Sequence, residues 1–187
     1  MKFFDSHAHL DDEKFDSDRE EIISKIKNDG IKNFITAGYS LEGSKKAVKL
    51  AEKYGFYYKT TGIWHKKNPM PRNMNLHFVN STEAWIYFTY KTRTGTFNNN
   101  GAVLHDFVET SVTPNGERKY GKHPTQKPES LMRHFVDVLS NVDDNILDPF
   151  MGSGTTGVAA KKAGRNFIGI ELSKEYFDMA SQRIQEA

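Results

Sequence analysis

The sequence predicts an α/β protein in which strands and helices alternate around one glycine-rich turn. The apolar run that ends at Ile146 and Leu147 is followed by Asp-Pro and then by three glycines within six residues. A stretch rich in alanine and lysine comes next and favours a helix, which Thr155 and Thr156 can cap. A second apolar run at 166–170 ends at Glu171. A strand, a glycine turn, a helix, a strand and a terminal acid form the layout of a nucleotide-binding crevice, in which the acid accepts hydrogen bonds from ribose hydroxyls.

Length and composition set the limits of this prediction. The 187 residues suit one domain, or one domain plus a fragment. A hydrophobic share of 37% and a mean hydropathy of −0.67 are low but compatible with a core. The net charge of only +2 does not by itself indicate a nucleic-acid-binding protein. The absence of cysteine excludes disulfides, thiolate metal sites and cysteine nucleophiles.

The hydropathy pattern argues against membrane insertion. No apolar run approaches the length of a membrane span. Acidic residues at positions 5, 11 and 12 come too early for a signal peptide. We therefore expect a cytoplasmic protein with no membrane contact.

The first 54 residues predict two strand–helix units. Strands are expected from residue 2 and over 31–38, and helices over 17–28 and 44–54. His7 and His9 are two residues apart, so they share one face of an extended segment and can chelate a divalent metal.

Residues 5–11, Asp-Ser-His-Ala-His-Leu-Asp, and the Thr-Ala-Gly that follows the second strand resemble the start of TatD-like metal-dependent deoxyribonucleases. The resemblance covers about 1–54 and implies a metal held by His7 and His9 together with ligands from later strands of a TIM barrel. Those later ligands have no counterparts here. The alternative is that both histidines are relics at a strand end.

The middle of the chain predicts two further strands and a polar segment. Residues 56–66 and 83–91 have strand character, and the prolines at 69 and 71 require a loop between them. Residues 92–121 are polar and rich in turn-forming residues. Helices are expected at 129–139, with a proline suited to the first turn just before it, and at 174–185. We expect the helix at 174–185 to pack Tyr176, Phe177, Ala180 and Ile184 inward.

Four motifs together resemble the β-class, adenine-type DNA methyltransferases, which methylate exocyclic amines. They are Trp-His-Lys-Lys-Asn-Pro-Met-Pro at 64–71, Ser-Thr-Glu-Ala-Trp at 81–85, Lys-His-Pro-Thr-Gln-Lys-Pro at 122–128, and Asp-Pro-Phe-Met-Gly-Ser-Gly-Thr-Thr at 148–156. The resemblance covers about 55–187 and implies a three-layer, Rossmann-like sheet, S-adenosylmethionine as cofactor, DNA as substrate, and a place in restriction-modification. The cofactor residues it implies are Asp148, Phe150, Gly152, Gly154, Thr155, Thr156, Glu171, His123 and Thr125.

The same resemblance implies two DNA-contacting segments. Trp64, His65 and Asn68 fall beside the flipped target base, where an aromatic ring and an amide suit stacking and edge recognition. Core packing is the alternative for Trp64. The 92–121 segment corresponds to target recognition, and its cations, together with the next lysine, suit phosphate contacts or else a solvated loop. These cations are Arg93, Arg118, Lys119 and Lys122.

One expected motif is missing, so the catalytic residues are unassigned. The family uses an Asp-Pro-Pro-Tyr or Ser-Pro-Pro-Tyr loop, and no such tetrapeptide occurs in this sequence. The family places it where the 1–54 segment lies. We therefore expect a sheet that is incomplete, or whose catalytic strands are replaced by the two TatD-like units. In the second case the first strand lies beside the Leu147 strand and residues 5–7 lie near the position of the missing catalytic loop.

Three functions remain open from the sequence. The first is a DNA methyltransferase acting on adenine, or on the amine of cytosine, with activity impaired by the missing tetrapeptide. The second is a metal-dependent DNA hydrolase. The third is a non-catalytic remnant that binds cofactor or DNA and acts with a complementing methyltransferase half or as a homodimer.

Overall fold

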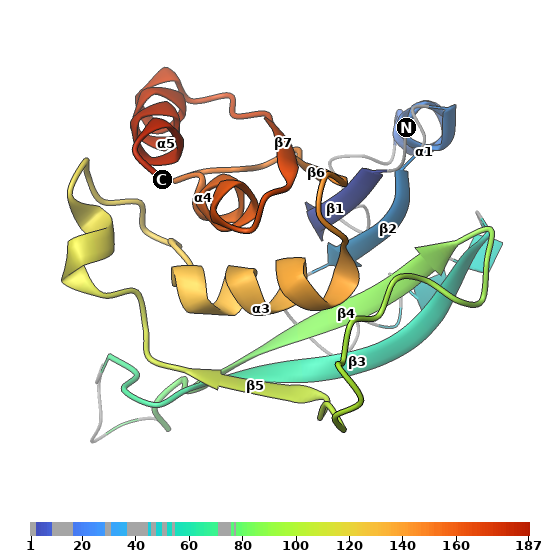
Figure 1. The fold of residues 1–187 in the computed structure, drawn as a ribbon, viewed down its shortest axis with the longest axis horizontal. Coiled ribbons are helices and arrows are strands. Elements are labelled where there is room, and N and C mark those ends of the chain that lie inside the picture. The colour runs from blue at the N-terminus through green and yellow to red at the C-terminus, as the bar shows by residue number, and fades with distance from the viewer. Residues whose placement is uncertain are drawn as a thin grey trace.

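The computed structural model describes residues 3–8, 17–28, 31–36, 45, 48, 49, 52, 53, 55–70, 76 and 78–187. The described strands form one seven-stranded sheet in the order β5-β3-β4-β2-β1-β6-β7 (Figure 1). The strands are β1 (Phe3–Ala8), β2 (Ile31–Thr36), β3 (Phe56–Lys66), β4 (Thr82–Tyr90), β5 (Phe107–Thr110), β6 (Asn145–Asp148) and β7 (Asn166–Gly169). The helices are α1 (Arg19–Asn28), α3 (Glu129–Leu139), α4 (Thr155–Lys162), α5 (Lys174–Gln185) and the short 3-10 helix η2 (Asn115–Arg118).

The strand directions bring most strand ends to one edge of the sheet. Strand β1 is parallel to β2 and β6, and β6 is parallel to β7. Strand β4 is antiparallel to both β2 and β3, so β3 and its parallel neighbour β5 run in the same direction as β2. The carboxyl ends of all strands except β4 therefore meet at one edge, which we call the carboxyl edge.

The leading segment is part of this sheet. Asp5 pairs in register with Leu147 of β6, and Phe3 pairs with Asn145. The expectation that the first strand lies beside the Leu147 strand is thus confirmed. Residues 45, 48, 49, 52 and 53 have helical backbone, as expected within 44–54.

The core lies between the sheet and helix α3. Residues of β3, β4 and β5 pack against the apolar face of α3, and the rings of Trp85 and Phe135 meet edge to face at 5.2 Å. Helix α4 packs against the other side of α3 and against β6 and β7, so α3 lies between β3–β5 and α4 (Figure 1). The buried cluster is Trp64, Tyr87, Val108, Leu131, Phe135, Leu139, Ile146 and Ala160.

Three local expectations need correction. Thr155 and Thr156 do not cap α4, because Gly154 is the N-cap residue and no side chain caps it. Phe177 does not face inward, since its side chain is 45% exposed; Met179, Ala180 and Arg183 form the buried face of α5. Strand β5 lies within the segment expected to be irregular.

Candidate functional site

The glycine-rich turn between β6 and α4 is built from left-handed backbone. Gly152 and Gly154 have φ values of 49° and 73°, which residues with a Cβ rarely adopt. A Cβ on Gly154 would lie 2.8 Å from the Cβ of Ala180, so this glycine lets α5 approach the turn. A Cβ on Gly152 would lie 3.0 Å from Nε2 of His123, so the absence of a side chain at Gly152 leaves space beside the imidazole.

Two carboxylates shape the turn from either side. Asp148 is buried, and its Oδ2 accepts a hydrogen bond from the Thr156 hydroxyl at 2.7 Å. Glu171 accepts from the backbone N–H of Gly152 at 2.9 Å and from that of Ser173 at 2.9 Å. Each ionised carboxylate oxygen has two acceptor positions, so Glu171 retains capacity for further donors.

The segment 122–128 approaches the turn at His123. The imidazole meets the ring of Tyr176 edge to face at 4.4 Å, and its Nδ1 lies 3.3 Å from the backbone N of Thr125. Burial lowers the pKa of His123 below its usual value; the nearby Glu171 opposes this and Lys127 adds to it. The structure therefore brings His123, Thr125, Gly152 and Glu171 together, as expected from the motifs.

A buried arginine supports the turn from below. Arg183 of α5 donates to the Ser153 carbonyl at 2.5 Å and to the Thr155 hydroxyl at 3.1 Å. The Thr155 hydroxyl in turn donates to the Lys127 carbonyl at 3.1 Å. Sequence reasoning missed Arg183, although a cation three residues after Ala180 on the buried face of a predicted helix was a visible signal.

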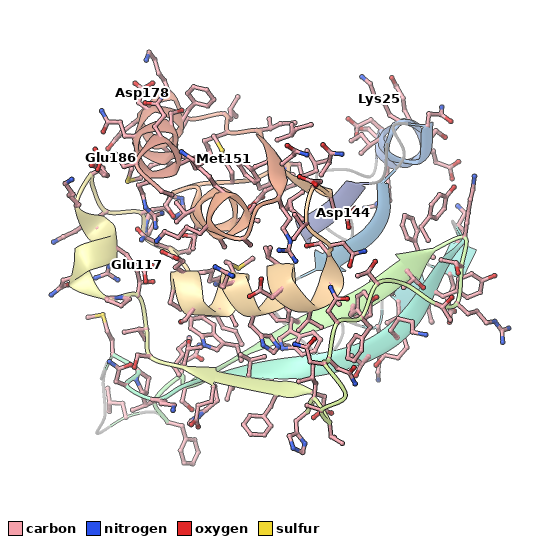
Figure 2. All side chains as sticks on the ribbon, viewed as in Figure 1. Lys25, Glu117, Asp144, Met151, Asp178 and Glu186 are labelled. Carbon is pink, nitrogen blue, oxygen red and sulfur yellow. The ribbon has the colours of Figure 1, made fainter. Side chains whose placement is uncertain are left out.

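Exposed apolar side chains surround Glu171. Phe150 is 47% exposed, Ile170 is 56% exposed and Leu172 is fully exposed. Met151 pairs its backbone N with the Ile170 carbonyl, which holds the Phe150 segment beside the end of β7 (Figure 2 labels Met151). Apolar groups next to an acid suit a ligand with a flat ring and vicinal hydroxyls.

The prediction that Trp64 stacks on a base is corrected by its burial. Its side chain is only 4% exposed within the core cluster, and its indole N–H donates to the Thr110 hydroxyl at 2.8 Å. The ammonium groups of Lys66 and Lys127 lie 5.2 and 5.5 Å from the ring centroid. Core packing, the alternative reading of Trp64, is what the structure has.

His65 and Asn68 lie at the carboxyl edge. His65 contacts strand β5, and Asn68 contacts the residues that follow β5. His65 Nδ1 is 2.7 Å from Glu109 Oε2, and the Asn68 side-chain oxygen accepts from the Val112 N–H at 2.9 Å. Both residues thus have structural partners on the 107–112 stretch, and both stay at the edge that carries the glycine-rich turn.

Arg93 lies at the edge of the sheet opposite the glycine-rich turn, and its predicted phosphate contact stays a prediction. It follows the carboxyl end of the antiparallel strand β4, and its guanidinium is 5.7 Å from the Tyr57 ring centroid. The neighbouring Asn98 donates to the Ser140 carbonyl at 2.8 Å, at the carboxyl end of α3. The first part of the 92–121 segment therefore caps α3 and does not reach the glycine-rich turn.

Two of the other predicted phosphate contacts, Arg118 and Lys119, lie nearer the turn. Arg118 ends η2 and Lys119 follows it, on the connection between β5 and His123 (Figure 1). The Lys119 ammonium is 3.0 Å from a carboxylate oxygen of Glu186, labelled at the end of α5 in Figure 2. This pair is exposed and therefore worth little to stability.

The predicted metal ligands fall largely outside the described structure. His9 lies outside the described residues, and for His7 only the backbone, in β1, is described. Within the described ranges, no group of three or more His, Asp or Glu residues could hold a metal ion. No helix in those same ranges is long and apolar enough to span a membrane.

Comparison with known proteins gives one family and a consistent fold. The family model described as DNA methylase (N6_N4_Mtase) matches residues 11–182. The type II methyltransferase M2.LlaDCHI of Lactococcus lactis subsp. cremoris is 39% identical over 144 residues, which are 72% of this chain and 54% of that protein. M2.DpnII of Streptococcus pneumoniae is 40% identical over 143 residues, or 72% and 53%. The chain thus spans about half the length of these curated relatives.

Solved structures extend the likeness to the whole chain. The crystal structure of an M1.HpyAVI–SAM complex matches with a TM-score of 0.79 and 32% identity, covering 98% of this chain and 88% of that one. The cytosine-N4-specific PvuII DNA methyltransferase matches with a TM-score of 0.73 at 17% identity, covering 98% and 79%, and shows the fold alone.

These matches bear on the leading segment. The family match begins at residue 11, and the M1.HpyAVI match covers nearly the whole chain, so both include most of the 1–54 region assigned above to a nuclease-like piece. They give no support to a separate TatD-like domain or to a chimeric chain. The strands β1 and β2 are accounted for as part of one methylase-like sheet.

Proposed function

Because the chain belongs to the DNA methylase family, we propose that it binds S-adenosylmethionine at the glycine-rich turn and serves methyl transfer to an amino group of DNA, with adenine as the target. The observation that carries this proposal is the meeting of Gly152, Glu171 and His123 at the carboxyl edge. The backbone of Gly152 is held by Glu171 at 2.9 Å, and a Cβ there would approach His123 to 3.0 Å.

The residues present fit the cofactor. Glu171 would accept hydrogen bonds from the ribose hydroxyls, while Phe150 and Leu172 would offer apolar contact to the adenine ring. His123 and Thr125 would hold the amino-acid end of the cofactor, and Gly152 leaves space beside His123 because it has no side chain. Asp148 acts indirectly by fixing Thr156 and the Phe150 N–H. The bound cofactor supplies an electrophilic methyl group on its sulfonium.

On the DNA side, the carboxyl edge is the place where a base would have to enter. Strand β1 pairs in parallel with β6 as far as Asp5 and Leu147, so its carboxyl end lies at the same edge of the sheet as Asp148. His65 and Asn68 stand at this edge, and Arg118 and Lys119 lie on the connection that leads to His123. We assign phosphate contact to Arg118 and Lys119, which makes DNA affinity salt-dependent.

Methyl transfer is tested with tritiated cofactor and mixed-sequence DNA, with a full-length relative as positive control. Separation of the product nucleosides distinguishes N6-methyladenine from N4-methylcytosine. Label in N6-methyladenine supports the proposal in full, and label in N4-methylcytosine overturns the choice of adenine. A chain that binds cofactor without transferring label contradicts turnover but not cofactor binding.

A second candidate is a cofactor- and DNA-binding component without turnover of its own. The observation that favours it is the absence of Asp-Pro-Pro-Tyr from the sequence, which leaves the base-stacking tyrosine without a counterpart. Such a component acts with a complementing methyltransferase half or as a homodimer. Label that appears only when a chain carrying the tetrapeptide is added supports this candidate, and label at full rate from the chain alone contradicts it.

The remaining hypotheses concern the leading segment and the cellular setting. A TatD-like origin of residues 1–54, with a metal at His7 and His9, rests on the sequence motif alone. DNA cleavage that requires a divalent metal and stops with a chelator tests it, and unchanged DNA would reject hydrolysis. A cytoplasmic place in a restriction-modification system accords with the methylase family and stays a proposal.

A further inference from the structure

Segment 122–128 is anchored to the rest of the molecule by the hydrogen bond from the Gln126 side-chain amide to the Glu117 carbonyl at 2.9 Å and by three further contacts. The Thr113 hydroxyl donates to the Gln126 carbonyl at 2.6 Å, and the Thr155 hydroxyl donates to the Lys127 carbonyl at 3.1 Å. The third anchor is an ion pair, because the Lys127 ammonium lies 2.5 Å from Oε2 of Glu83 in strand β4. In the first two anchors a threonine hydroxyl binds a backbone carbonyl of the segment, whereas the third joins the Lys127 side chain to a strand of the sheet.

Glu83 is well placed to hold this lysine. Its other oxygen is 2.8 Å from the Lys66 ammonium, and the ammonium groups of Lys66 and Lys127 both lie over the Trp64 ring. Burial alone would raise the pKa of Glu83, but hydrogen bonds from Lys127 and Lys66 hold it below its usual 4.5. Glu83 is therefore ionised at neutral pH and bridges two partly buried cations.

The contact continues from Lys127 into the glycine-rich turn. The Lys127 carbonyl accepts from Thr155, whose hydroxyl accepts from Arg183, and Arg183 also holds the Ser153 carbonyl. Lys127 thus joins strand β4 to the turn, because its ammonium contacts Glu83 and its carbonyl accepts from the Thr155 hydroxyl. A shift of Lys127 would move both His123 and the support of Thr155.

We propose that Glu83 is a positioning residue: through Lys127 it fixes the 122–128 segment against the glycine-rich turn and thereby sets the affinity for the cofactor. This inference rests on the proposed function, because it concerns the same site. Glu83 itself touches neither the turn nor the ligand position. Its role is to hold Lys127 in one place.

The test is a double-mutant cycle on Glu83→Gln and Lys127→Met. S-adenosylmethionine affinity is measured by calorimetry, and amide hydrogen exchange over 152–156 is measured without ligand. We expect each single variant to bind roughly five- to tenfold more weakly, with faster exchange in the turn, and the double variant to be no weaker than the worse single variant. Lys127→Arg, which keeps the cation, should bind close to the native level.

The matched control is the ion pair between Glu129 and Lys162, which has a similar length of 2.8 Å and joins α3 to α4 without contacting the 122–128 carbonyls. Glu129→Gln should change neither affinity nor exchange over 152–156. Thermal unfolding of every variant verifies that it is folded.

The outcomes separate this inference from the proposed function. If the native chain binds S-adenosylmethionine and Glu83→Gln has the same affinity and the same exchange over 152–156, the positioning role is overturned and the proposed function stands. No binding by the native chain overturns the proposed function and the affinity claim with it. Because exchange is measured without ligand, unchanged protection over 152–156 in Glu83→Gln contradicts the positioning role in either case.

Discussion

Two features require glycine at position 154: the left-handed backbone of the turn and the close packing of α5. Gly154 has a left-handed φ of 73°, and the space where a Cβ would stand is taken by Ala180. Gly101 has a similar φ of 77° but has no atom within 4 Å of its Cβ position. The pair of glycines therefore separates backbone strain from steric overlap.

We expect Gly154→Ala to destabilise the protein clearly more than Gly101→Ala. Strain in the left-handed region costs about 1–2 kcal/mol at either position, and overlap with Ala180 adds about 1–3 kcal/mol at Gly154 alone. Urea unfolding measures both changes. Equal losses of unfolding free energy would show that the close approach of α5 to the turn is not a constraint.

The His123 imidazole should make stability depend on mildly acidic pH. Its pKa is depressed in the folded protein, mainly by burial, so protonation favours the unfolded chain. Stability should be full above the usual value of 6.5 and decrease as the pH falls from there through the lowered pKa. The melting temperature between pH 7.5 and pH 5 measures this, and His123→Asn should flatten the curve; an identical slope in that variant would contradict it.

At the residue scale, the motifs predicted the positions of His123, Gly152 and Glu171 because each is fixed by local sequence. The burial of Trp64 and the position of Arg93 were not predictable from local sequence. Trp64 is buried by β5, a strand that pairs with it from 44 residues further along the chain. Arg93 lies at the edge opposite the glycine-rich turn because β4 is antiparallel to its neighbours, a direction that only the assembled sheet fixes.

Helix α3 is the element around which the core is built, and its apolar positions repeat with helical spacing. Leu131, Phe135 and Leu139 face the strands, while Met132 and Val136 face α4. Phe135→Ala should therefore cost about 3–5 kcal/mol. Phe177→Ala, at a ring that is 45% exposed on α5, should cost much less. Urea unfolding compares the two, and similar costs would contradict this assignment of the core.

The bounds of a helix or strand could be predicted where the residues that mark its ends lie next to it in the sequence. The expected bounds 56–66, 129–139 and 174–185 match β3, α3 and α5. Gly55 directly precedes β3, Pro128 directly precedes α3, and the Ser173 side chain caps the start of α5. Strand β5 has only four residues, with Phe107 exposed and Val108 buried, so its pattern is too short to read. Its existence depends on pairing with β3, where the Ile63 N–H donates to the Asp106 carbonyl.

At the scale of the whole molecule, one sheet contains both β1 and β2, the strands of the leading segment, and β6 and β7, the strands on either side of the glycine-rich turn and α4. The prediction that β1 lies beside β6 followed from the order of strand and helix units and is confirmed by the Asp5–Leu147 pairing. The nuclease-like identity given to that segment came from a short histidine motif, and the family match from residue 11 gives it no support. Parallel strand–helix units of different families look alike over 50 residues, so such a motif identifies a segment poorly.

We propose that S-adenosylmethionine binds at the turn held by Glu171 and Arg183. Calorimetric titration of the native chain tests it most directly, with Gly152→Val as the variant that fills the space beside His123. We predict saturable heat with one site per native chain and its loss in a Gly152→Val protein that still unfolds cooperatively. No heat and no thermal shift from the folded native chain at millimolar cofactor would contradict it.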